Sequence, residues 1–327
     1  MTVQSHIQVN RLSVHYGVGG NLFGKGGVLK AVDDISLEIP RGSFFGLVGE
    51  SGSGKTTLGR AILKAAPISE GEVYYKDEDV DYDVGKLSKS ELKDYRKRTQ
   101  LIFQDPYAAL SPRMTVRDII AEPLEVMKLT KNRAETDERV REIAAKCRLN
   151  LEHLRRFPHA FSGGQRQRIS IARALVCQPK FLVADESVAA LDVSIQADIL
   201  NLLKSLQKEM DITFLFISHD LSVVAHTCDV VAVMYLGAIV EMAPSRELFT
   251  APKHPYTKAL LSAIPSLDPD DRGKAQKLEG EIPSPLNKPS GCRFHTRCPM
   301  AAARCSVDAP VWREHSPSHF TACHFAE

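Results

Sequence analysis

Hydrophobic and polar positions alternate over residues 32–39, and this period of two predicts a half-buried β-strand. Residues 7–14, with Ile7, Val9 and Leu12 spaced along them, are also expected to form a strand. Residues 44–48 are instead apolar throughout, as expected for a strand that is buried on both faces of a parallel sheet. Gly237 predicts a hairpin turn. Further apolar runs typical of strands lie at residues 181–184, 214–217 and 230–235.

Helical spacing of apolar residues recurs between these strands. Residues 133–148 carry Val140, Ile143, Ala144 and Cys147 at the spacing of one helix face, and residues 194–210 repeat the pattern. A helix is also expected over residues 57–64. We interpret the long segment at about 105–175 as a helical subdomain inserted into an α/β core.

The amino-acid composition of the chain changes after Pro244. Prolines accumulate there, which argues against further regular core, and four of the seven cysteines fall within the last 36 residues. We expect a main domain over residues 1–243 and a small second domain over residues 244–327.

Size and composition are those of an ordinary globular protein of about two domains. Apolar residues make up 43% of the 327 residues, and the net charge of +2 gives no field that would attract nucleic acid. No apolar run reaches the length of a membrane span, and residues 1–6 lack the features of a signal peptide. The sequence therefore predicts a cytosolic protein whose cysteines are reduced or bound to metal.

A glycine-rich stretch directly follows the apolar run 44–48. Its glycines allow successive backbone N–H groups to point at phosphates, and the helix that follows adds the positive end of its dipole. Lys55 would neutralise the β- and γ-phosphates, and the Thr56 hydroxyl would bind Mg²⁺. The stretch predicts a nucleoside triphosphate site that consists of Gly49, Glu50, Ser51, Gly52, Ser53, Gly54, Lys55 and Thr56.

Three other polar positions follow apolar strands or runs. Asp185 ends the run 181–184, where its carboxylate can reach the metal, and Glu186 beside it is a candidate general base. His219 is a candidate contact of the γ-phosphate, although by itself it could be a structural histidine. Gln104 can touch Mg²⁺ or the attacking water and also the helical subdomain, so it could report the nucleotide state.

The segment Ser162, Gly163, Gly164 and Gln165 predicts a second anion site. Ser162 can cap a helix while the two glycines expose backbone donors. Because one chain cannot easily fold both anion sites onto the same phosphate, we expect two chains to pair head to tail around ATP. Tyr16 could stack on the adenine, or it could be an ordinary aromatic residue at a strand end.

In this order, the motifs resemble those of the ABC ATPases, and more closely the ATP-binding subunits of bacterial dipeptide/oligopeptide importers. The narrower resemblance rests on residues 47–55, 161–168, 192–194, 217–224, 254–261 and 282–285. The resemblance extends the phosphate loop to Thr57 and assigns Asp192 to the loop that crosses the dimer interface. It implies an ABC-type α/β core with an antiparallel β subdomain, an inserted helical subdomain and a small cysteine-containing extension.

The same resemblance implies the partner subunits of the protein and its location in the cell. A homologous second ATPase, two transmembrane permeases and an extracytoplasmic solute-binding protein would complete a transporter at the cytoplasmic face of the membrane. Two departures from the family pattern bear on activity: Ser187 replaces a proline after the catalytic glutamate, and Ala189 replaces a serine. One of the two ATP sites could therefore be weakened, but Glu186 and His219 remain, so hydrolysis is expected.

Three other functions stay open at this level. Nickel or another small solute could replace peptides as cargo. A soluble ABC ATPase of translation or DNA repair is less consistent with a single phosphate loop and with the lack of sustained heptads. A non-hydrolysing regulatory subunit would fit Ser187 and Ala189.

The cysteines of the C-terminal region suggest a metal site. Cys292, Cys298, Cys305 and Cys323 lack a C-x-x-C knuckle, so structural zinc is less favoured than another cofactor. The resemblance implies a [4Fe–4S] cluster, which four cysteines can hold. Zinc and free cysteines remain the alternatives.

Overall fold

The computed structural model describes residues 4–19, 27–189, 191–264 and 280–326. The chain forms two compact units, and both are discontinuous in sequence. Unit 1 comprises Met1–His6, Pro40–Phe44 and Lys86–Ile217, whereas unit 2 comprises Ile7–Ile39, Phe45–Gly85 and Ser218–Glu327. The phosphate loop therefore belongs to unit 2, and the expected helical subdomain belongs to unit 1.

Unit 1 is built on three parallel strands. β7 (Phe181–Asp185) lies between β6 (Thr99–Ile102) and β8 (Thr213–Ser218), and all three run in the same direction. Every residue of β7 and β8 is buried, as the unbroken apolar runs predict. The Phe44 ring stacks on Phe214 with the ring centroids 4.8 Å apart.

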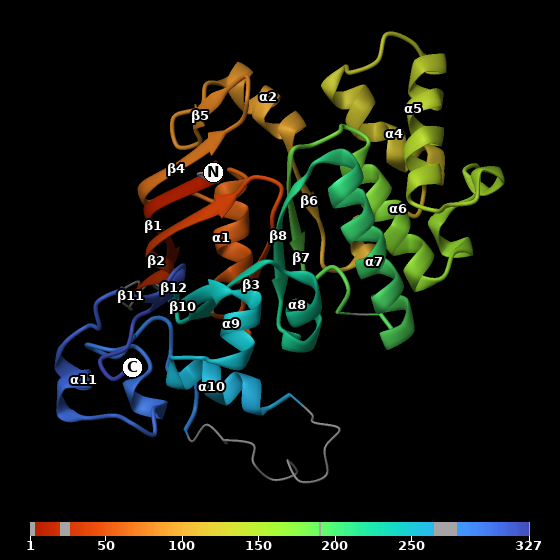
Figure 1. The fold of residues 1–327 in the computed structure, drawn as a ribbon. Coiled ribbons are helices and arrows are strands. Elements are labelled where there is room, and N and C mark those ends of the chain that lie inside the picture. The colour runs from red at the N-terminus through yellow and green to blue at the C-terminus, as the bar shows by residue number, and fades with distance from the viewer. Residues whose placement is uncertain (1–3, 20–26, 190, 265–279, 327) are drawn as a thin grey trace. The chain divides into compact units, whose positions relative to one another are not determined.

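Unit 1 also contains helices, of which α4, α5 and α6 pack against one another (Figure 1). The apolar face predicted over residues 133–148 is the buried face of α5. The segment expected to be helical, at about 105–175, contains four helices, and α7 confirms the helix predicted over residues 194–210. The helices are α2 (Lys89–Arg98), α3 (Pro106–Ala109), α4 (Val116–Met127), α5 (Arg133–Lys146), α6 (Gly163–Leu175) and α7 (Val193–Met210), with 3₁₀ turns at Leu151–His153 and Pro158–Ala160.

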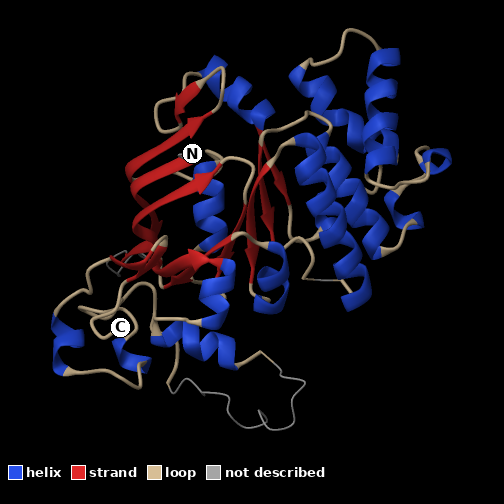
Figure 2. Cartoon of the chain, in the orientation of Figure 1, coloured by secondary structure: helices blue, strands red, loops and turns tan. Residues whose placement is uncertain are grey.

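Unit 2 contains two groups of strands (red in Figure 2). One is a four-stranded sheet in the order β2-β1-β4-β5, with β1 (Ser5–Val18), β2 (Gly27–Pro40), β4 (Glu70–Lys76) and β5 (Asp81–Asp83). β4 pairs antiparallel with both β1 and β5, which agrees with the antiparallel subdomain implied by the resemblance.

The second group of strands in unit 2 has the order β11-β12-β10-β9-β3. Here β3 (Phe44–Val48) pairs parallel with β9 (Val230–Tyr235), and Gly237 lies in the tight turn from β9 to β10 (Ala238–Pro244) with a φ of 81°. The remaining strands and helices of unit 2 are β11 (Arg313–Ser316), β12 (His319–Thr321), α1 (Lys55–Ile62), α8 (Leu221–Thr227), α9 (Ser245–Thr250), α10 (Pro255–Ser262), the 3₁₀ turn His295–Arg297 and α11 (Ala303–Val307).

The C-terminal region has more regular structure than its prolines suggest. Pro255 is the first residue of α10, where the missing N–H breaks no helical hydrogen bond. β12 pairs antiparallel with β10, so the region adds strands to the second sheet of unit 2. Tyr256 and Phe294 are fully buried in it. The prediction that regular core ends near Pro244 is therefore wrong, while the domain boundary at residue 244 stays a prediction.

Candidate nucleotide site

The phosphate loop joins β3 to α1 and depends on three glycines. Gly49, Gly52 and Gly54 have φ values of 149°, 78° and 107°, which residues with a side chain rarely adopt. A Cβ on Gly49 would lie 2.1 Å from the carbonyl oxygen of Met234, and one on Gly54 would lie 2.3 Å from that of Ala31. The loop therefore needs glycine for its backbone conformation and for the close approach of neighbouring backbone.

Lys55 begins α1 and is folded back against the loop. Its Nζ donates hydrogen bonds to the carbonyl oxygens of Gly49, at 2.8 Å, and Glu50, at 3.0 Å. The residue is only 5% exposed, so its charge lies inside the loop that would surround the phosphates. The buried Ser53 hydroxyl has no hydrogen-bond partner among the described residues. Such an orphaned donor fits a site made for an anion.

Two residues of the C-terminal region contact the phosphate loop, and sequence reasoning missed both. The Glu50 N–H donates to the Tyr256 hydroxyl over 2.9 Å. Arg297 donates to both carboxylate oxygens of Glu50, over 2.7 and 3.0 Å. More than 200 residues separate each pair, so no local pattern could have found them.

Gln104 and Glu186 lie at the carboxyl ends of adjacent parallel strands of unit 1. Gln104 Nε2 donates to Glu186 Oε2 over 2.8 Å. Glu186 has a φ of 45°, and its N–H donates to the Ile217 carbonyl oxygen. Asp185, the last residue of β7, is 4% exposed. The structure therefore brings together Gln104 and Glu186, which the sequence singled out, while Asp185 precedes Glu186 in the chain.

The segment at residues 162–165 forms the capped start of α6. Ser162 Oγ accepts from the Gln165 N–H at 3.4 Å, and the Gln165 side chain accepts from the Ser162 N–H at 3.0 Å. This reciprocal pair is a capping box. The prediction that Ser162 caps a helix is confirmed, and both side chains are exposed at the helix end.

The start of α6 packs closely on the segment that carries Asp192. A Cβ on Gly164 would lie 2.5 Å from Ile195 Cγ2, and one on Gly163 would lie 3.6 Å from Leu191 Cδ2. Asp192 is exposed at the start of α7, although its side chain does not cap the helix. Gly164 thus has a packing role that the sequence did not reveal.

Cationic side chains of α6 link this helix to the segment that follows Gln104. The Arg166 guanidinium carbon lies 4.2 Å from the centroid of the Tyr107 ring. Arg173 donates to the Ala109 carbonyl oxygen over 2.7 Å. Both contacts join residues within the segment 105–175, so the expectation that Gln104 itself touches the helical subdomain stays a prediction.

Tyr16 and His219 are the most weakly supported members of the predicted site. Tyr16 lies near the end of β1 and is 37% exposed, which suits either adenine stacking or an ordinary strand-end aromatic. His219 is exposed directly after β8. His219 falls in unit 2 and Glu186 in unit 1. Their roles stay predictions.

The four C-terminal cysteines do not form a metal site in the structure. Across the described ranges, no three or more His, Cys, Asp or Glu side chains are grouped so that they could hold a metal ion. Burial, reinforced by the charges of Cys305, Cys323 and Cys298, raises the pKa of Cys292 to about 11. The structure does not support the predicted [4Fe–4S] cluster or its zinc alternative.

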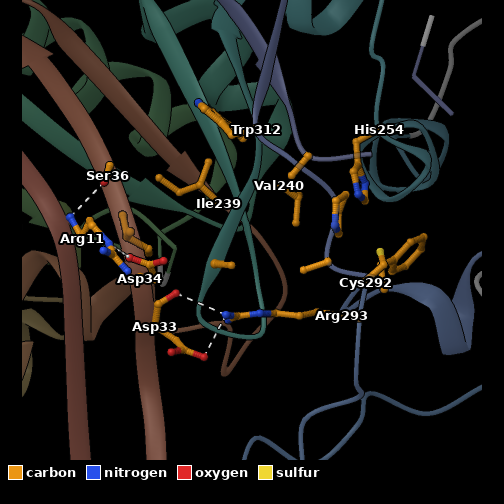
Figure 3. A pocket seen from close by; sticks show the side chains of 17 residues that line it. Arg11, Asp33, Asp34, Ser36, Ile239, Val240, His254, Cys292, Arg293 and Trp312 are labelled. Carbon is orange, nitrogen blue, oxygen red and sulfur yellow. Dashed lines mark hydrogen bonds and ion pairs between the residues drawn. The ribbon is translucent and has the colours of Figure 1, made fainter. Parts of the chain in front are cut away.

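Unit 2 also contains a cavity of about 440 Å³ beside the C-terminal region (Figure 3). Arg293 points across it toward Asp33, and their side chains form an ion pair of 2.9 Å. Trp312 and Cys292 contribute to its lining. The lining includes no residue of the phosphate loop, so this cavity is separate from the candidate nucleotide site.

Comparison with known proteins agrees with this geometry. Residues 32–189 match the ABC transporter family, and residues 240–305 match the C-terminal region of oligopeptide/dipeptide transporters. A Brucella ovis protein is 50% identical over 99% of this chain and 98% of its own. An oligopeptide transport ATP-binding protein of Haemophilus influenzae is 47% identical over 99% of both chains, and one of Bacillus subtilis is 46% identical over 97% and 96%.

The chain belongs to the ATP-binding subunits of ABC transporters. Within that family, this ABC ATPase carries the C-terminal region of the oligopeptide/dipeptide class. A solved dimeric bacterial ABC transporter cassette is 28% identical with a TM-score of 0.64, over 73% of this chain and 99% of that one. The same cassette in a post-hydrolysis state with ADP and phosphate is 27% identical with a TM-score of 0.63, over the same shares.

In the part of the chain that the structure describes, every helix is too short or too polar to cross a bilayer.

Proposed function

We propose that this ABC ATPase hydrolyses ATP to power the import of dipeptides or oligopeptides. The observation that carries the proposal is the coexistence of two features in one chain. One is a phosphate loop in which three glycines have positive φ, and the other is the C-terminal region of oligopeptide/dipeptide transporters. Relatives that match nearly the full chain are oligopeptide transport ATP-binding proteins.

The phosphate loop supplies the main anion contacts in this proposal. Backbone N–H groups of the loop would surround the phosphates, apart from that of Glu50, which donates to the Tyr256 hydroxyl, and the start of α1 would add its dipole. Lys55 is already buried within the loop, so its ammonium group is positioned to meet the β- and γ-phosphates. Tyr16, exposed near the end of β1, would stack on the adenine.

Three oxygen-bearing side chains suit Mg²⁺, which prefers hard oxygen ligands. They are the Thr56 hydroxyl at the start of α1, the buried Asp185 carboxylate at the end of β7, and the Gln104 side-chain amide. When bound, the ion would neutralise negative charge on the phosphate oxygens.

Glu186 is the proposed general base. Its carboxylate accepts a hydrogen bond from Gln104, which fixes its orientation next to the strand end. A carboxylate held in this way can take a proton from the attacking water. His219 would contact the γ-phosphate from the segment that follows β8.

Two chains would close around each ATP, with the capped start of α6 in one facing the phosphate loop of the other. Ser162, Gln165 and Asp192 are exposed where the start of α6 packs against the start of α7. Val193 beside them is also exposed, at 83%. The related cassette is dimeric with ADP and phosphate bound, and this supports the same arrangement here.

The remaining partners follow from the class of transporter. A homologous second ATPase would complete the dimer, two transmembrane permeases would carry the peptide, and an extracytoplasmic binding protein would deliver it. The chain would then lie at the cytoplasmic face of the membrane as a peripheral subunit. The helical subdomain, linked to Gln104 through Tyr107 and Arg166, would transmit the nucleotide state to the permeases.

The test is the Glu186→Gln variant in the assembled transporter. It should retain ATP but hydrolyse it at least about 100-fold more slowly, which is the usual scale for a lost general base. Glu152→Gln, an exposed glutamate elsewhere in unit 1, is the control. Unchanged turnover in Glu186→Gln would contradict the proposed base. Peptide uptake by membrane vesicles that contain the complex tests the cargo, and uptake of nickel alone would contradict it.

A further inference from the structure

The phosphate loop is held from outside by the C-terminal region of its own chain. Glu50, the second residue of the loop, forms a two-pronged ion pair with Arg297, in which Nη1 and Nη2 donate over 2.7 and 3.0 Å. The backbone N–H of the same residue donates to the Tyr256 hydroxyl over 2.9 Å. Glu50 is therefore fixed at both its side chain and its backbone.

These contacts lie in a largely dry environment. The Arg297 side chain is 6% exposed and that of Glu50 is 24% exposed. Tyr256 packs against Tyr235 and Phe294, with ring centroids 4.7 and 5.3 Å apart. Hydrogen bonding to Glu50 raises the pKa of Arg297, so the guanidinium is always charged. Replacing only one partner would leave the charge of the other poorly solvated, and this destabilises a protein strongly.

A displacement of Glu50 would reach the residues that bind phosphate. Gly49 precedes Glu50 and packs closely on Met234, since an added Cβ would lie 2.1 Å from the Met234 carbonyl oxygen, so the backbone has little room to shift on that side. Lys55 Nζ bonds to the Glu50 carbonyl oxygen at 3.0 Å. The position of Glu50 and the position of the Lys55 ammonium are thus linked by a direct hydrogen bond.

We propose that Arg297 and Tyr256 are positioning residues that hold the phosphate loop in its binding-competent shape, so that the C-terminal region sets the ATP affinity of the chain. The inference rests on the proposed phosphate-binding role of this loop. It gives the C-terminal region a part in nucleotide binding, beyond packing against the second sheet of unit 2.

The experiment measures ATP binding by the full-length chain and steady-state ATPase in the assembled transporter. Arg297→Gln should raise the dissociation constant for ATP about tenfold, in line with a lost hydrogen-bonded charge, and Tyr256→Phe should raise it a few fold. The KM for ATP should rise in parallel, while kcat at saturating ATP stays within about twofold because the reacting groups are untouched. Arg304→Gln, which removes an exposed arginine from the same region, should change neither constant.

Two further variants separate positioning from general stability. If Arg297 acts through Glu50, adding Arg297→Gln to Glu50→Gln should weaken ATP binding no further, whereas additive losses would overturn the inference. Should Arg297→Gln fail to fold, Tyr256→Phe still decides, because it removes one oxygen and keeps the ring. Unchanged ATP affinity in a folded Tyr256→Phe and a folded Arg297→Gln would overturn the proposal.

Lys55→Ala distinguishes failure of this inference from failure of the proposed function. If Lys55→Ala abolishes ATP binding while Arg297→Gln leaves it intact, only the positioning role is wrong. If Lys55→Ala binds ATP normally, the loop is not the nucleotide site, and both proposals fall together.

Discussion

Gln104 donates a hydrogen bond to Glu186 over 2.8 Å, although 82 residues separate them in the chain. The contact exists because β6 and β7 are parallel neighbours, paired from Thr99 opposite Phe181 to Ile102 opposite Ala184. Residues just beyond the two carboxyl ends therefore meet at one edge. Glu186, the proposed base, is oriented by a residue that also begins the connection to the helical subdomain.

We expect Gln104→Ala to slow ATP hydrolysis by about tenfold or more in the assembled complex, on the scale of one lost interaction that orients the base. Binding of ATP to the isolated chain should be affected less than hydrolysis, because the phosphate loop is intact and only the proposed Mg²⁺ contact of Gln104 is lost. Gln100→Ala is the matched control, since Gln100 lies on β6, the strand that leads to Gln104, but donates to the Arg96 carbonyl oxygen. Equal ATPase rates in wild type and Gln104→Ala would contradict the role.

Gly164→Ala should destabilise the protein by about 1–3 kcal/mol, because the added methyl would lie 2.5 Å from Ile195 Cγ2 and overpack the junction of α6 and α7. Urea unfolding of the full chain measures the loss. Gly163→Ala is the control, since its methyl would meet its nearest neighbour, Leu191 Cδ2, at an ordinary 3.6 Å. If both variants unfold at the same urea concentration, the close contact with Ile195 does not require a glycine at position 164.

His254 should make the protein sensitive to acid. Burial lowers its pKa from 6.5 to about 3, so between these values the unfolded chain binds a proton that the folded chain does not. The free energy of unfolding should therefore fall as the pH falls, by about 2 kcal/mol between pH 7 and pH 5 from this group alone.

The matched variant is His254→Asn. Asparagine can still accept the Tyr256 N–H as the cap of α10, but it does not titrate in this range. Unfolding of this variant should take up about one proton fewer than unfolding of the wild type, so its free energy of unfolding should change less with pH. A substitution at the half-exposed His324 should leave the pH dependence unchanged. An unchanged pH dependence in His254→Asn would show that another group is responsible.

Ser187→Ala should raise the free energy of unfolding by about 1 kcal/mol or leave it unchanged, because the buried hydroxyl has no hydrogen-bond partner among the described residues. ATPase activity should persist, since Glu186 and Gln104 are retained. Comparing urea unfolding and ATPase for this variant tests both statements. A marked loss of activity would show that the hydroxyl takes part in the reaction, whereas a wild-type chain that hydrolyses no ATP in the assembled complex would support the regulatory-subunit alternative.

The sequence predicted the chemistry of the site because each motif is local. Three glycines with Lys55 form one short loop, and Ser162 with Gln165 forms one helix cap. In such motifs, the side chain and the backbone that positions it are neighbours in the chain, so spacing alone carries the information. The apolar runs predicted β3, β7 and β8 for a related reason, since burial on both faces leaves no polar positions.

The prolines after residue 244 misled the prediction because their effect depends on position. Pro255 occupies the first turn of α10, where it is tolerated, and pairing of β12 with β10 depends on residues about 80 positions apart. The cysteine spacing likewise suggested a cluster, but in the described structure the four thiols do not converge into a metal-binding group.

The residues themselves therefore determined the phosphate loop, the helix cap and the carboxylates, and hence the class of chemistry. Tertiary structure alone decided that Gln104 contacts Glu186 and that Gly164 packs on Ile195. It also decided that Arg297 and Tyr256 form hydrogen bonds with Glu50. The physical reason is that these partners are between 31 and 247 residues apart in the chain. A periodic pattern of hydrophobic residues predicts local structure, but it does not predict which distant residues the folded backbone brings into contact.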